Sequence, residues 1–325
     1  MTPADAETEA LRALLPEPVL RRLQALRRTA SGTTLVLDAT GIAPAAREEL
    51  EGEARAALAG AHGADPLRVA MTADKVARRI IAVGSGKGGV GKSTVAANLA
   101  VALARAGRRV GLVDADIYGP SQARLLGTEG RRPVAHDKRL VPIDSDWGVP
   151  VLSMAHLSDP GQAIAWRGPM ASGAVTQLLE GQWDGFEVLV VDLPPGTGDI
   201  QLTMLQKFKP AGAVIVSTPQ DLALMDAARA VALFEKGGVP VIGVVENMAG
   251  YACPHCGEVS DPFGVGGAEA AAQDMAVPFI GRIPLTIAIR RDSDAGTPPA
   301  AAETDPQAPF ATLAAKVDAW LRDNP

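Results

Sequence analysis

The segment 84–94, GSGKGGVGKST, has the residue types and the spacing of a loop that binds nucleotide phosphates. Residues 86–93 follow the pattern G-x-x-x-x-G-K-S, after an apolar run at 80–83 and before a helix-like stretch at 93–106. Glycines let backbone N–H groups turn towards phosphate oxygens, and the start of a helix adds partial positive charge. The sequence therefore predicts an ATP site formed by Gly86, Lys87, Gly88, Gly89, Val90, Gly91, Lys92, Ser93 and Thr94.

Three carboxylates in two further segments supply acidic groups suited to nucleotide hydrolysis. Asp114 and Asp116 follow the apolar run in GLVDADIYGPS, and Asp192 ends the run in FEVLVVDLPPGTGD. Carboxylates at the ends of parallel strands lie at the edge of the sheet where ligands bind. We expect Lys92 to bridge the β- and γ-phosphates, and Ser93 and Asp192 to hold Mg²⁺. Asp114 or Asp116 would orient the attacking water, and their spacing does not decide between them.

The only two cysteines, Cys253 and Cys256, stand in the segment CPHCG. They fit a thiol–disulfide oxidoreductase, half of a zinc site, half of an iron–sulfur site, or two structural thiols. The residues that follow, GEVSDPFGVGG, make a poor helix start, which disfavours the redox interpretation. Zinc and a [4Fe–4S] cluster each take four ligands, so this pair completes neither site within one chain unless histidine ligands join. A site shared by two chains across a two-fold axis is therefore the natural hypothesis.

The elements that position these residues are alternating strands and helices between residues 79 and 290. The apolar runs that end in loops are separated by helix-like stretches at 93–106, 168–181, 199–208, 220–236 and 266–274. Continuously apolar strands separated by helices indicate a parallel sheet covered on both faces. The predicted fold class is α/β: a P-loop NTPase with a mostly parallel β-sheet flanked by helices, preceded by a small α+β N-terminal domain.

Two domains are expected, a small one at 1–75 and a P-loop ATPase domain at 79–325 that carries the cysteine loop at 253–256. In the first we predict a helical stretch from Leu11 through Leu26, a strand at 33–39, a helix at 45–60 and a strand in LRVAMTA. None of its residues points to chemistry. In the second, residues 292–308 are expected to be loop, and a last helix is expected at 309–322.

Composition and charge disfavour several classes of function. The net charge is −6 and no long basic run is present, which argues against nucleic-acid binding. No apolar stretch approaches the ~20 residues that span a bilayer, and the acidic N-terminus does not resemble a secretory signal. The last helix has balanced charges, so we expect it to pack on the body and not to bind a membrane. A cytoplasmic location is expected.

Lys87 is one lysine more than the phosphate-binding pattern needs. With it the loop resembles the deviant Walker A ATPases, which include MinD and ParA proteins, nitrogenase iron protein and arsenite-pump ATPases. In that group the early lysine reaches across a nucleotide-sandwich dimer to the phosphates on the partner. The resemblance implies a homodimer in which Lys87 acts in trans, as an arginine finger does. The predicted catalytic residues are therefore Lys87, Lys92, Asp114 and Asp116.

Further segments resemble the Mrp/ApbC family of iron–sulfur cluster carrier ATPases. They are VDADIYGPS, WRGPM at 166–170, DLPPGTGDIQLT at 192–203, VSTPQDLALMDA at 216–227, GVVENMAGYACPHCG at 243–257, FGVGGAEA at 263–270 and GRIPL at 281–285. The resemblance implies that Cys253 and Cys256 hold a [4Fe–4S] cluster shared across the dimer, which zinc can replace in aerobic preparations. It also implies ATP-dependent transfer to apo-proteins, contact with a cluster-assembly scaffold, and an Asn247 that reads the adenine edge.

The N-terminal zone departs from the family pattern. Many members carry an Asp-Pro-Glu turn there, and related proteins carry a reactive cysteine, but residues 1–75 have neither; the nearest match is LPEP at 15–18. We therefore expect a target-docking or structural role for this zone. Two alternatives to a cluster carrier are a positioning or partitioning ATPase of the MinD/ParA type and a zinc-stapled dimer that binds nucleotide as a structural cofactor.

Overall fold

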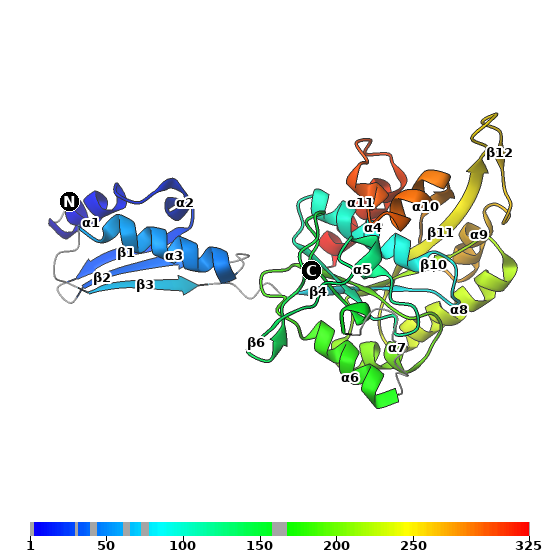
Figure 1. The fold of residues 1–325 in the computed structure, drawn as a ribbon, viewed down its shortest axis with the longest axis horizontal. Helices are drawn as coiled ribbons and strands as arrows, with labels where there is room; N and C mark the ends of the chain where they lie inside the picture. Colours follow the sequence, from blue (N-terminus) through cyan, green and yellow to red (C-terminus); the bar gives the residue numbers. More distant parts are fainter. Residues whose placement is uncertain are drawn as a thin grey trace. The chain divides into compact units, whose positions relative to one another are not determined.

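The computed structural model describes residues 3–29, 32–39, 44–60, 66–72, 78–157 and 168–324. The chain divides into two compact units, Met1–Ala77 and Arg78–Pro325 (Figure 1). We call them the N-terminal unit and the C-terminal unit. Trp166 and Arg167 of the WRGPM segment lie outside the described residues.

The N-terminal unit is a three-stranded sheet with helices packed on it. Its strands are β1 (Leu23–Thr29), β2 (Gly32–Asp38) and β3 (Leu67–Thr72), and its helices are α1 (Pro3–Arg12), α2 (Glu17–Leu20) and α3 (Pro44–Leu58). β2 lies in the middle, antiparallel to β1 and parallel to β3. The buried core of this unit consists of Leu11, Leu15, Val19, Leu35, Leu37, Leu50, Ala54 and Leu58.

The predicted helix through Leu26 was wrong, because Leu23 and Leu26 belong to β1. The register of β1 against β2 shifts between Leu23 and Ala25, where a β-bulge adds one residue. A bulge interrupts the two-residue alternation of a strand, so residues three apart reach the same face. Leu23 and Leu26 both pack against the core in this way. Their spacing of three had the appearance of a helical period.

The C-terminal unit is built on an eight-stranded sheet that is parallel except at one edge, which confirms the predicted fold class. The strand order is β12-β11-β10-β4-β9-β5-β8, and β13 also pairs with β11. Only the β11–β12 pair is antiparallel among these described pairings. The bounds are β4 (Arg79–Gly84), β5 (Val110–Asp114), β8 (Val151–Ser153), β9 (Val188–Asp192), β10 (Gly212–Ser217), β11 (Val241–Ala252), β12 (Val259–Ser260) and β13 (Phe279–Leu285).

Helices cover both faces of this sheet. They are α4 (Lys92–Arg105), α5 (Gln122–Leu125), α6 (Gly168–Leu179), α7 (Asp199–Thr203), α8 (Asp221–Lys236), α9 (Gly267–Asp274), α10 (Ile287–Asp294) and α11 (Pro309–Asp323). α4, α10 and α11 lie on one side, and α6, α7 and α8 lie on the other (Figure 1). A separate apolar core fills each side, as expected for strands whose residues are buried on both faces.

The segment 292–308, predicted as loop, contains the end of α10 and a 3₁₀ turn at Pro299–Ala301. Tertiary contacts hold this turn, because Asn98 Oδ1 accepts a hydrogen bond from Ala300 N at 2.8 Å. α11 packs on the body as predicted, burying Phe310, Leu313, Ala314, Val317 and Leu321. In the described part of the chain, no helix has the length and the apolar content needed to cross a membrane.

Candidate functional site

The phosphate-binding loop joins β4 to α4. Gly91, whose φ is +78°, immediately precedes Lys92, the first residue of the helix. A side chain at Gly86 would collide with the backbone of α8, and one at Gly91 would collide with the amide of Asn247. The loop encloses a hollow of about 250 Å³, lined by Lys87–Thr94 together with Ser85, Asp116, Gly119 and Pro195. Backbone N–H groups, a helix start and two lysines make this hollow suited to a polyphosphate.

The register of the sheet brings the predicted carboxylates to this loop. Asp114 ends β5 and is paired across the sheet with Asp192, which ends β9. Lys92 Nζ forms ion pairs with Asp192 and, at 3.6 Å, with Asp116 Oδ2. Burial lowers the pKa of Lys92, but the charges of Asp192, Asp116 and Asp114 and a hydrogen bond to Asp192 outweigh it and raise that pKa above its usual value. Lys92 is therefore a cation held among carboxylates.

Asp116 and Asp114 differ in what they face. Asp116 lines the hollow, whereas Asp114 is fully buried behind it. Asp116 Oδ1 accepts hydrogen bonds from Tyr118 N and Gly119 N at 3.1 and 3.2 Å, and its Oδ2 lies on the side of Lys92. The geometry therefore favours Asp116 as the carboxylate that meets a substrate in the hollow.

Asp114 is hydrogen-bonded to residues that lie outside the phosphate-binding loop. Its carboxylate accepts hydrogen bonds from Gln122 N at 3.0 Å and from Ser153 Oγ at 2.8 Å. Burial and repulsion from Asp192 raise the pKa of Asp114 to about 7, against these hydrogen bonds and the charge of Lys92.

Gln122 is a member of the site that sequence reasoning missed. Its Nε2 donates hydrogen bonds to Asp192 Oδ2 at 2.8 Å and to Ser93 O at 2.9 Å. It therefore links the end of β9 to the first turn of α4. Its place shortly after the acidic segment could have indicated a role in the site. A glutamine at that place is, however, not typical of any particular chemistry.

Asn247 is hydrogen-bonded to the phosphate-binding loop from β11, which β10 separates from β4 in the sheet. Its Nδ2 donates a hydrogen bond to Val90 O at 2.8 Å, and the side chain is largely buried. Asn247 belongs to β11, so this bond fixes the loop to the strand that continues to the cysteines. A role in reading adenine stays a prediction.

The cysteines lie beyond the end of β11, in a knuckle between β11 and β12. Cys253 N donates to Glu258 O at 2.9 Å, and Gly257 N donates to Cys253 O at 2.8 Å. Cys256 is exposed, and Cys253 is partly exposed; neither forms a disulfide. Hydrogen bonds from the backbone of Cys256, which contribute most, and of His255 lower the pKa of Cys253. A lowered pKa favours the thiolate, which is the form of cysteine that binds metals.

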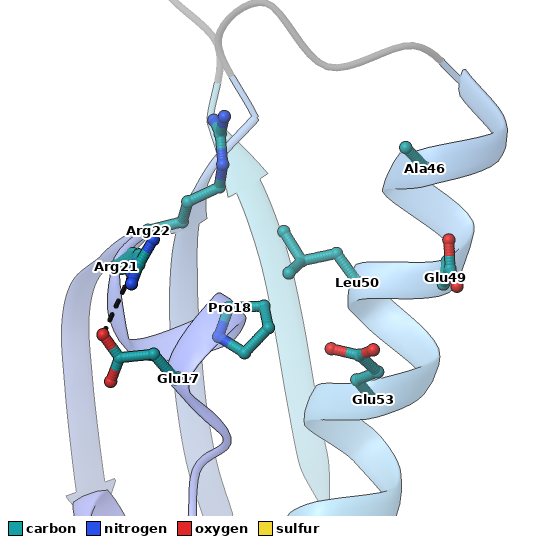
Figure 2. A pocket seen from close by; sticks show the side chains of 8 residues that line it. All are labelled: Glu17, Pro18, Arg21, Arg22, Ala46, Glu49, Leu50 and Glu53. Atoms are coloured by element: carbon teal, nitrogen blue, oxygen red, sulfur yellow. Dashed lines mark hydrogen bonds and ion pairs between the residues drawn. The ribbon is translucent and has the colours of Figure 1, made fainter.

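A second hollow, of about 560 Å³, lies in the N-terminal unit between α2 and α3 (Figure 2). Its lining combines apolar groups with charged ones: Glu17, Pro18, Arg21, Arg22, Ala46, Glu49, Leu50 and Glu53. An ion pair of 3.0 Å joins Arg21 to Glu17 at its edge. The titratable groups of this lining are carboxylates and guanidinium groups.

The fold and the phosphate-binding loop define a P-loop NTPase. Solved structures agree: a nucleotide-binding protein from Archaeoglobus fulgidus, in complex with ADP, matches with a TM-score of 0.60 and 41% identity, over 68% of this chain and 87% of that one. The cell division ATPase MinD from Pyrococcus furiosus matches with a TM-score of 0.57 and 27% identity, over 74% of this chain and 99% of that one.

Sequence comparison identifies the family. Residues 76–318 match the model of the NUBPL iron-transfer P-loop NTPases, and the chain belongs to this family. The iron–sulfur cluster carrier protein of Pseudomonas fragi is 53% identical over 239 residues, which are 73% of this chain and 82% of that protein. The predicted resemblance to iron–sulfur cluster carrier ATPases is thereby confirmed.

Proposed function

We propose that the chain carries an iron–sulfur cluster on Cys253 and Cys256 and delivers it to apo-proteins in an ATP-dependent cycle, as a nucleotide-sandwich homodimer. One observation carries the proposal: the accessible thiols of Cys253 and Cys256 follow the strand whose Asn247 is bonded to the phosphate-binding loop. The family and the name of the relative from P. fragi support iron–sulfur cargo.

The ligand count supports a cluster shared between two chains. Two thiolates are half of the four ligands that a [4Fe–4S] cluster takes. Among the described residues, no group of three or more His, Cys, Asp and Glu side chains is placed to hold a metal ion. In the proposal, Cys253 and Cys256 of a second chain supply the missing pair.

The surroundings of the phosphate-binding loop support closure of a dimer over the nucleotide. Lys87 borders the hollow, and its ammonium group has no ion pair within the described residues, in contrast to that of Lys92. Large exposed apolar side chains stand on segments that follow the strands at this edge of the sheet: Tyr118, Met170, Leu202, Leu222 and Met225. In the proposal these side chains meet the partner chain, as exposed apolar groups of an interaction surface do.

The site fits Mg²⁺ together with ATP. Mg²⁺ takes oxygen ligands and keeps several waters. Ser93 Oγ and the Asp192 carboxylate both lie beside Lys92, and Gln122 adds a buried oxygen with no partner. Bound Mg²⁺ would neutralise charge on the phosphates. Asp116 would orient the attacking water at the hollow.

Strand β11 is the physical connection between nucleotide and cargo. Past Asn247, its register against β13 shifts before Tyr251. Met248 has a φ of +58° and Gly250 one of +75°, so the strand is irregular between the two sites. ATP would close the dimer through Lys87 and, by way of β11, change the separation of the two cysteine loops and their hold on the cluster.

A MinD-type positioning ATPase is the second candidate, because the fold matches that of MinD from P. furiosus. A membrane-binding helix at the end of the chain would need a free apolar face. In α11 that face is buried against α4 and β13, with Phe310, Val317 and Leu321 inside the core. This packing favours the carrier function.

The test is anaerobic reconstitution followed by transfer to an apo-protein that takes a [4Fe–4S] cluster. We expect iron and acid-labile sulfide in equal amounts, and faster transfer with ATP and Mg²⁺ than with neither. Zinc without sulfide would instead favour a zinc-stapled dimer. Transfer at the same rate with and without ATP would contradict the ATP-dependent cycle.

A further inference from the structure

Gln122 combines complete burial with a side-chain oxygen that has no partner. It is the first residue of α5, and its backbone N–H is bonded to Asp114. Its Nε2 donates to Ser93 O and to Asp192 Oδ2. Both partners of Nε2 are acceptors, so the orientation of the amide is fixed: a flipped amide would place oxygen against oxygen.

The remaining atom, Oε1, is buried and accepts no hydrogen bond. In the described part of the chain, four buried side-chain polar atoms lack a partner, and only this one belongs to a side chain that is bonded to the phosphate-binding loop. Buried acceptors are normally satisfied, and an exception beside a binding site is consistent with a donor that arrives with the ligand. The donor must be small, because the side chain has no exposed surface.

We propose that Gln122 is a positioning residue for magnesium in the nucleotide site. Its Nε2 holds Ser93 and Asp192, which we expect to face the ion, and its Oε1 accepts a hydrogen bond from a water molecule of the ion's shell. Mg²⁺ retains several waters when it binds with phosphates, and each of these waters is a donor. The inference rests on the proposed function only in requiring that the chain binds a nucleotide with Mg²⁺.

The test compares ADP affinity with and without Mg²⁺, measured by calorimetry, in the unchanged protein and in Gln122→Met. Methionine preserves length but supplies neither donor nor acceptor. Loss of an outer-shell partner typically weakens metal affinity about 10–100-fold. The factor by which Mg²⁺ increases ADP affinity should therefore be at least about tenfold smaller in Gln122→Met than in the unchanged protein. The ADP affinity without metal should be nearly the same in both.

Two further variants separate this role from general damage to the fold. Gln201→Met is the matched control, because Gln201 is a buried glutamine whose Nε2 and Oε1 are both bonded to backbone groups; its Mg²⁺ effect should match that of the unchanged protein. Gln122→Glu keeps an acceptor but places a carboxylate oxygen where Nε2 donates to Ser93 O and Asp192 Oδ2, so the tightening by Mg²⁺ should fall as it does in Gln122→Met. The glutamate variant also decides the question if the methionine variant does not fold.

The outcomes are distinguishable. Equal tightening by Mg²⁺ in Gln122→Met and the unchanged protein would overturn the role of Gln122, and so would a glutamate variant that keeps the full tightening of the unchanged protein. If the unchanged protein bound ADP without any effect of Mg²⁺, the proposed nucleotide chemistry itself would fail. Mn²⁺ can replace Mg²⁺ in a second experiment, in which its paramagnetic resonance signal reports metal binding without any need for turnover.

Discussion

Replacing both Cys253 and Cys256 by alanine is expected to abolish bound iron and acid-labile sulfide after anaerobic reconstitution, while ADP still binds. Cys256 is exposed and Cys253 partly exposed at the end of β11, and neither belongs to a core, so their loss should not disturb the fold. Each single variant should already lose most of the cluster. In a two-fold assembly one substitution removes two of the four thiolate ligands.

The control for this experiment is His255→Ala, in the same exposed turn. His255 stands between the thiols, and a cluster held by four cysteines does not need it, so iron and sulfide should stay near the level of the unchanged protein. A double cysteine variant that still assembled a full cluster would place the cargo elsewhere. Loss of iron in His255→Ala to the same extent as in the cysteine variants would show that the turn holds the metal through a different ligand set.

Replacing Lys87 by alanine is expected to reduce the rate of ATP hydrolysis by about 10³-fold, with little change in nucleotide affinity. A cation supplied in trans to the transferred phosphoryl group contributes about 10³–10⁵ to the rate. Lys92→Ala should differ, because Lys92 belongs to the site of its own chain and lies among its carboxylates. That variant should lose both binding and hydrolysis.

Mixing two inactive variants tests whether Lys87 acts across the dimer. In a mixed dimer of Lys87→Ala with Asp116→Asn, one site keeps its own Asp116 and receives Lys87 from the other chain. An equal mixture should recover about a quarter of the original rate, because about half of the dimers are mixed and each has one intact site of two. No recovery in the mixture, although both variants exchange subunits, would place Lys87 in the site of its own chain.

Local patterns in the sequence were sufficient to predict the sheet and most of the site. Buried strands such as Val188–Asp192 are continuously apolar, and an aspartate at the end of such a strand must lie at the edge of the sheet. That edge is where Lys92 meets Asp192, although 100 residues separate them in the chain. The shape of the loop was likewise predictable from its glycines. Gly89 and Gly91 have positive φ, and Gly86 packs too closely on α8 to carry a side chain.

Features that depend on contacts distant in the chain were not predictable. Leu23 and Leu26 are three residues apart, as in a helix, and the bulge in β1 lets both face the core from a strand. The 3₁₀ turn at Pro299–Ala301, in the segment predicted as loop, is held by a hydrogen bond from Ala300 N to the distant Asn98 Oδ1. Gln122 is meaningful only through its distant partners Ser93 and Asp192, and the bond from Asn247 to the phosphate-binding loop arises from strand order. Residue type alone carries none of this information.

Native mass spectrometry of the anaerobically reconstituted protein, with ATP and Mg²⁺ present, tests the sharing of one cluster by two chains most directly. We predict a species whose mass equals two chains plus a single [4Fe–4S] cluster, and this species should be missing from the double cysteine variant. A single chain that carries a complete cluster, or a dimer that carries one on each chain, would contradict the shared site.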